Sequence, residues 1–178
     1  MDPRIIEKRK LQKEKRKRER LRAIQWIIRL ALFGVILYTM LNALVFTIIS
    51  VDGDSMYPTF SNRDRLAFSR INIKENRLQR GDIILFKGND GRSYIKRIIG
   101  LPGEFVEINN GVVYINGREY KQDVSRAYTY VYNNDKWYLK SGQFFVLGDN
   151  RDQDDSKDSR IFGPIDIKDI KGKYLLGL

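Results

Sequence analysis

The 178-residue sequence contains no cysteine and no histidine. The absence of cysteine excludes a disulfide framework, thiol catalysis and a cysteine-ligated zinc site. The absence of histidine excludes a Ser-His-Asp triad and every metal site that depends on imidazole. Acid–base chemistry in this protein must therefore use carboxylates, lysines or tyrosines. We expect no metal ion and no organic cofactor.

Positive charge is concentrated at the N-terminus. Residues 1–22 contain eleven Lys or Arg against four acids, whereas the other 156 residues contain 22 against 18. Residues 30–49 carry no charge, and a helix of that length spans about 30 Å, the thickness of a bilayer core. The pattern predicts a basic arm over residues 1–22, a transmembrane helix over 23–49 and a separate domain over 50–178.

Two alternatives to a retained anchor are a buried core helix and a cleaved signal peptide. The length of the apolar run and its charged flank disfavour the first, and the absence of a clear Ala-x-Ala site disfavours the second. Lysine and arginine before the span place the N-terminus in the cytoplasm and the domain outside, in a single-pass protein of the cell membrane.

The basic arm is expected to lie near anionic phospholipid headgroups of the bilayer. Nucleic acid is the competing partner. It is disfavoured because residues 1–22 contain no aromatic side chain for stacking on bases and directly precede the span. We therefore expect no nucleic-acid partner.

The residues after the span predict a mainly β domain, antiparallel and partly closed. Short segments rich in β-branched and aromatic residues alternate with turn signals. A two-residue Asn116-Gly117 turn predicts a hairpin. The expected strands lie within residues 82–87, 93–100, 105–108, 112–117, 129–134, 136–140 and 143–148.

The segment GDSMYPTF places Ser55 in a turn, and a serine nucleophile needs a base. Arginine cannot serve, but a lysine can if burial lowers its pKa. In an extended strand Lys96 shares a face with Tyr94 and Ile98, two large neighbours. Periodicity alone nevertheless favours the other interpretation, an exposed lysine on an edge strand.

Four segments occur in order after the predicted span: GDSMYPT, RGDIILFK, YIKRIIGLPGE and GDNRDQDDSKDSRIFGP. Together they resemble the type I signal peptidases, in the single-span form of Gram-positive members. The resemblance implies a serine endopeptidase that cleaves N-terminal signal peptides from exported preproteins after small-x-small sites. It also implies Ser55 as nucleophile, Lys96 as general base, and a functional link to the protein translocation channel.

The resemblance implies further roles around this pair. Ser156 would hydrogen-bond and orient the Lys96 amine, and Asp158 and Arg160 would form a supporting ion pair. The substrate pocket would be lined by four residues whose alternative role is core packing: Val51, Met56, Tyr94 and Ile95.

The charged segment 148–164 does not fit a calcium loop. Counted from Asp152, the sixth position is Lys157 where glycine is needed, and the twelfth is Gly163 where a bidentate acid is needed. We expect no metal site in this segment.

Two departures from the family pattern concern the site. Gly53 stands where some members have a hydroxyl that donates to the oxyanion, so the backbone N–H of Ser55 is the first expected donor. Four residues, in place of the usual three, separate Arg151 from Ser156. Two other functions stay open: specialised processing of a few surface proteins such as pilins, and a non-catalytic assembly factor, which the presence of Ser55 and Lys96 disfavours.

Overall fold

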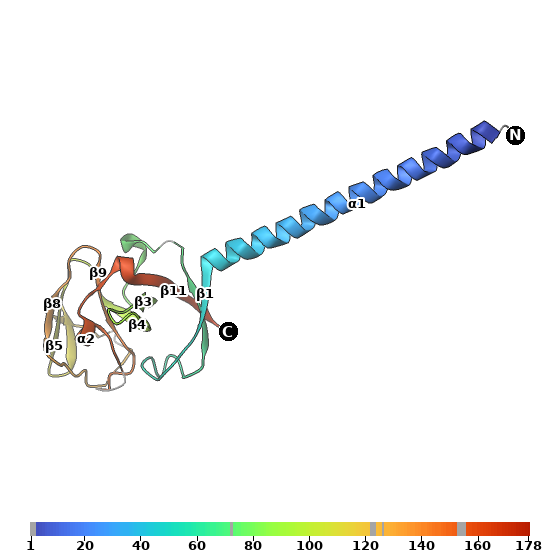
Figure 1. Cartoon of the computed structure of the whole chain (residues 1–178). Helices are drawn as coiled ribbons and strands as arrows, with labels where there is room; N and C mark the ends of the chain where they lie inside the picture. The colour runs from blue at the N-terminus through green and yellow to red at the C-terminus, as the bar shows by residue number, and fades with distance from the viewer. Residues whose placement is uncertain (1–2, 72, 122–123, 126, 153–155) are drawn as a thin grey trace. The chain divides into compact units, whose positions relative to one another are not determined.

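A computed structural model describes residues 3–71, 73–121, 124–125, 127–152 and 156–178. The chain divides into two compact units, Met1–Leu44 and Val45–Leu178. We call the first the helical unit and the second the β unit, and each is described by itself (Figure 1).

The helical unit is a single helix, α1 (Pro3–Val45). Its stretch Lys15–Met40 is long and apolar enough to cross a membrane, and every side chain of this stretch is exposed. The helix ends earlier than predicted, because residues 46–49 belong to a strand, β1 (Phe46–Ser50). Thr47, Ile48 and Ile49 are β-branched residues that favour a strand, and β1 gains a partner in strand β2. An uncharged run of residues alone does not distinguish a helix from a strand.

Over the residues that the structure describes, the β unit contains two antiparallel sheets. In Figure 1 the smaller sheet lies on the side of this unit away from β1. The larger sheet has the order β1-β2-β11-β3-β4-β9-β10, with β2 (Arg65–Ser69), β3 (Ile83–Lys87), β4 (Ser93–Gly100), β9 (Gln143–Leu147), β10 (Ile165–Asp166) and β11 (Ile170–Gly177). The smaller sheet has the order β7-β6-β5-β8, with β5 (Phe105–Asn109), β6 (Val112–Ile115), β7 (Arg118–Glu119) and β8 (Lys136–Tyr138). Three single turns of helix complete the unit: η1 (Glu75–Arg77), α2 (Ser159–Phe162) and η2 (Ile167–Asp169).

Strand β4 contributes to all three hydrophobic clusters of the β unit. Ile98 packs in the cluster that contains Phe86 and Phe144. Ile99 faces the smaller sheet and packs in the cluster of Trp137, while Ile95 packs against the cluster of Met56. Because β4 lies between β3 and β9, its backbone is held on both sides and its side chains are fixed in position.

The predicted mainly β, antiparallel fold is confirmed, as is the hairpin of β6 and β7. Ile115 pairs with Arg118, and the turn residues Asn116 and Gly117 have φ of 50° and 76°, the positive values that a type I′ turn requires.

The strand predicted over residues 129–134 is wrong. Its backbone makes other contacts: the Thr129 N–H donates to the Gly111 carbonyl, and the Tyr130 carbonyl accepts from Arg160. Aromatic and β-branched residues therefore lie in an irregular segment that contacts a loop glycine and the Arg160 side chain of α2 in place of a neighbouring strand. The sequence interpretation also missed the strands β1, β2, β10 and β11.

Replacing Gly100 by alanine should destabilise the β unit by about 1–3 kcal/mol. A Cβ at this position would lie 2.6 Å from Val106 and 2.7 Å from Leu139, inside the cluster of Trp137. Urea unfolding of the full chain in detergent would be followed by Trp137 fluorescence in a Trp26→Phe background. In the control Gly177→Ala the new Cβ would have its nearest neighbour at 3.8 Å; equal unfolding midpoints for the two variants would contradict the prediction.

Candidate active site

Ser55 and Lys96 are brought together from distant parts of the chain. Ser55 lies in the turn that follows β1, and Lys96 lies in the middle of β4. The amine nitrogen of Lys96 is 2.6 Å from the hydroxyl oxygen of Ser55, within hydrogen-bond distance. This is the approach that a nucleophile and its base require.

The turn that carries Ser55 is closed by backbone hydrogen bonds. The Val51 N–H donates to the Asp64 carbonyl at 2.8 Å, and the Arg63 N–H donates back to the Val51 carbonyl at 2.9 Å. Met56 and Phe60 are buried in the adjacent cluster. The serine is thus presented by a loop that is fixed at its base and anchored by apolar side chains.

Lys96 is buried, with 1% of its surface exposed. Burial disfavours the charged ammonium and lowers the pKa of Lys96 from 10.5 to about 8. The Asp158 carboxylate raises this pKa, the Arg160 guanidinium lowers it, and Asp149 raises it. A substantial fraction of the amine is therefore neutral near physiological pH, as a general base must be. The alternative of an exposed edge-strand lysine is excluded.

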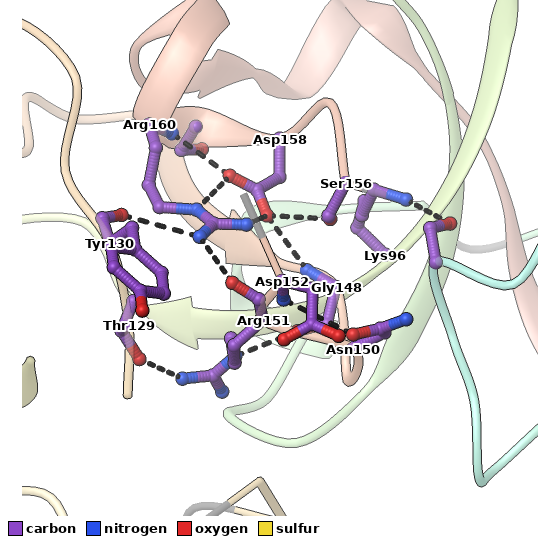
Figure 2. A network of polar contacts seen from close by, with 12 residues as sticks. Lys96, Thr129, Tyr130, Gly148, Asn150, Arg151, Asp152, Ser156, Asp158 and Arg160 are labelled. Atoms are coloured by element: carbon purple, nitrogen blue, oxygen red, sulfur yellow. Dashed lines mark hydrogen bonds and ion pairs between the residues drawn. The ribbon is translucent and has the colours of Figure 1, made fainter. Parts of the chain in front are cut away.

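Asp158 is the centre of a buried polar network beside Lys96 (Figure 2). The Arg160 guanidinium donates to both carboxylate oxygens of Asp158, at 2.9 Å each, and neither side chain is exposed. The Gly148 N–H donates to Asp158 at 3.0 Å, and the Ser156 hydroxyl donates to it at 2.8 Å. The ion pair implied by the resemblance is thus present in the structure.

The contact expected between Ser156 and the Lys96 amine is not formed. Among the described residues, Ser156 gives its single hydroxyl proton to Asp158 and no hydrogen bond joins it to Lys96. Its oxygen still has lone pairs that can accept a proton from an ammonium. Figure 2 shows the two side chains as neighbours.

A second polar network, centred on the buried Asp149, was missed in the sequence. Arg97 holds Asp149 with two hydrogen bonds of 2.8 and 2.6 Å, and the Thr59 hydroxyl donates to Asp149 at 2.5 Å. These contacts join the Ser55 turn, β4 and the turn after β9. The signal in the sequence was the arginine beside Lys96 and the acid of the GDNR segment, but nothing in their spacing indicates a pair across 52 residues.

Arg151 was also missed. It is buried, and it donates to the Gly148 carbonyl and to the Thr129 hydroxyl, both at 2.8 Å. Its guanidinium therefore ties the turn after β9 to the irregular segment that contains Thr129 (Figure 2).

A groove of about 360 Å³ opens beside Ser55 and Lys96. Its walls come from the end of β1 and the segment after it, from the first half of β4 with the residue before it, and from single residues of β3 and the SKDSR segment. The four residues expected to form the substrate pocket all line it: Val51, Met56, Tyr94 and Ile95. The groove therefore joins apolar side chains to the reactive pair.

Two features bear on what the site can stabilise. In the part of the chain that the structure describes, the backbone N–H of Ser55 donates to no other group, so it can donate to a developing oxyanion. Within that same part, no group of three or more acidic residues could hold a metal ion. A peptide carbonyl placed against Ser55 would meet a nucleophile, a base and one oxyanion donor.

Comparison with known proteins identifies the family. A family model described as "Signal peptidase, peptidase S26" matches residues 23–177. Signal peptidase IB of Staphylococcus aureus (strain Mu50) is 34% identical over 167 residues, which cover 84% of this chain and 86% of the relative. Signal peptidase I of Bacillus caldolyticus is 33% identical over 172 residues, covering 89% and 91%.

Among solved structures, a signal peptidase I from Enterococcus faecalis is 34% identical, with a TM-score of 0.45. The match covers 56% of this chain and 97% of that chain. The match of the family model to most of the chain and the identity to the curated relatives agree, and the chain belongs to the peptidase S26 family of signal peptidases.

Proposed function

We propose that this chain is a membrane-anchored serine endopeptidase that removes N-terminal signal peptides from exported preproteins after small-x-small sites. Family membership already indicates signal-peptide cleavage by a serine peptidase. The observation that carries the finer proposal is the 2.6 Å contact between Ser55 and the buried Lys96.

The proposed reaction begins with the neutral amine of Lys96. It takes the proton of the Ser55 hydroxyl while the Ser55 oxygen attacks the carbonyl carbon at the cleavage site. The Ser55 N–H stabilises the oxyanion of the tetrahedral intermediate. The Lys96 ammonium then gives its proton to the leaving amine, an acyl-enzyme forms, and Lys96 next takes a proton from the water that hydrolyses it.

The surrounding polar networks keep this geometry. Lysine has a flexible stem, and a base must be held in one position to act. Ser156, Asp158 and Arg160 form a wall of satisfied polar groups beside Lys96. We assign these three residues a positioning role, with Ser156 able to accept from the ammonium.

The substrate would bind as an extended strand in the groove, between the segment after β1 and the start of β4. Val51, Met56, Tyr94 and Ile95 give this groove apolar walls close to Ser55. Shallow apolar pockets suit the small side chains at positions −1 and −3 of the cleavage site.

The helical unit would anchor the enzyme through the stretch Lys15–Met40. The excess of Lys and Arg over residues 1–22, before the uncharged run, supports a cytoplasmic N-terminus and an extracytoplasmic β unit. The chain would then be a single-pass protein of the cell membrane, in contact with phospholipid and functionally linked to the protein translocation channel.

Ser55→Ala and Lys96→Ala should each lower kcat/KM for preprotein cleavage by about 10³-fold or more, because each removes one half of the reacting pair. The assay would use a purified preprotein in detergent micelles, with the cut mapped by mass spectrometry. Lys136→Ala, at an exposed lysine of the smaller sheet, is the matched control and should retain activity. Cleavage that survives Lys96→Ala would show that another group is the base.

The pH profile of kcat/KM should rise with pH and level off above a midpoint near 8. The neutral form of Lys96 is the active one, and the lowered pKa of Lys96 is about 8, so at pH 7 about a tenth of the enzyme is competent. Initial rates at low substrate concentration from pH 6 to 10 would measure this limb. A midpoint near 10.5, or a flat profile, would contradict the role of Lys96.

Lys96→Met should inactivate the enzyme and yet stabilise its fold at pH 7 by about 1–3 kcal/mol. The pKa of Lys96 is lower in the folded protein, about 8 against 10.5, so unfolding takes up a proton between these values. Below pH 8, burying the Lys96 amine lowers the free energy of unfolding by its full amount. This loss disappears as the pH rises toward 10.5. Urea unfolding at pH 7 and pH 10 would compare the two proteins; a variant no more stable than wild type at pH 7 would contradict this assignment.

A further inference from the structure

Two cationic side chains line the groove without a part in the proposed chemistry. Arg92 and Lys157 both lie in its wall and both are exposed. Among the described residues, neither forms an ion pair with a carboxylate within 4.0 Å. Arginine and lysine at the edge of a binding groove attract an anionic group on whatever binds there.

Arg92 and Lys157 both lie near enough to Asp90 to lower its pKa, although they are distant in the sequence. The carboxylate of Asp90 accepts from the Tyr94 hydroxyl at 2.6 Å and from the Arg92 N–H at 3.0 Å. These hydrogen bonds, and then the charges of Arg92 and Lys157, lower the pKa of Asp90. Asp90 offsets one of the two positive charges in part, and this end of the groove stays cationic.

Asp52 is the acid among the described residues that line the groove, and it belongs to the segment after β1, close in sequence to Ser55. Arg92 directly precedes β4, and Lys157 belongs to the SKDSR segment. A peptide strand in the groove would thus meet two cations outside the segment that carries Asp52.

The position of Arg92, directly before β4, indicates which part of a substrate it meets. Arg92 precedes Lys96 by four residues, a distance of about 13 Å along an extended chain. Ile95, which lines the apolar pocket, lies between them. A bound peptide strand has the same rise per residue, so the substrate residue beside Arg92 is about four to six positions before the cut.

We propose that Arg92 and Lys157 are specificity-determining residues that favour an acidic side chain four to six residues before the cleavage site. This inference rests on the proposed function, because it takes the groove as the site of the signal peptide's C-terminal segment. The two cations attract a carboxylate on one substrate and repel a lysine on another. The ratio of kcat/KM for these two substrates should therefore be larger than either effect alone would give.

The experiment compares three versions of one preprotein that differ only at position −5, which carries Asp, Asn or Lys. Full-length enzyme in a non-ionic detergent cleaves each version, and the readout is the ratio of kcat/KM for Asp to that for Lys. Wild type should prefer Asp by about five- to thirtyfold at 50 mM salt. The ratio should fall by 500 mM salt, because exposed charges are screened.

The double variant Arg92→Gln/Lys157→Gln should reduce this ratio to near one. Lys140→Gln/Lys168→Gln removes the same net charge from exposed lysines outside the groove and should keep the wild-type ratio. A change of equal size in both double variants would show a general charge effect and overturn the proposal.

Other outcomes separate the two proposals. If wild type cleaves the Asn version but shows no preference between Asp and Lys, the inference is wrong and the proposed function stands. If none of the three versions is cleaved, the proposed function fails. If the double variant loses activity equally on all three versions, and only in vesicles with phosphatidylglycerol, the two cations contact lipid headgroups and the inference is overturned.

Discussion

The burial of the Lys96 amine is the constraint on which the geometry of the site depends. Lys96 is 1% exposed and lies 2.6 Å from Ser55. Burial is the largest influence on the pKa of Lys96 and lowers it, whereas Asp158 raises it, Arg160 lowers it and Asp149 raises it. The burial comes from the placement of β4 between the clusters of the β unit.

The close approach of three loops is the second requirement. Gly148 lies between the Ser55 turn and the SKDSR segment, and a Cβ there would come within 2.5 Å of the Ser55 carbonyl and 2.2 Å of the Ser156 oxygen. The Asn150 N–H donates to the same Ser55 carbonyl. Only glycine lets the backbone after β9 contact the nucleophile turn this closely, so this residue type is set by packing.

Residue chemistry alone predicted only part of the site. Without histidine and cysteine, a serine nucleophile needs a carboxylate, a lysine or a tyrosine as its base, and periodicity alone favoured an exposed Lys96. Family resemblance then implied the pair of Ser55 and Lys96, with Ser156, Asp158 and Arg160 beside it. What the sequence could not give was pairing at long range: the contact of Arg97 with Asp149, and strand β1, paired with β2, in place of the last turn of an apolar helix. Each of these is decided by a partner elsewhere in the chain.

The junction between α1 and β1 contains no linker. The helix ends at Val45, the strand begins at Phe46, and the groove wall starts at Ile49. A chain of about ten residues separates the helix end from Ser55, so the nucleophile can never lie more than about 35 Å from that end. If the helix is held in a bilayer, cleavage is confined to a thin layer at its surface. A peptide bond folded deep inside an exported domain would be protected by distance alone.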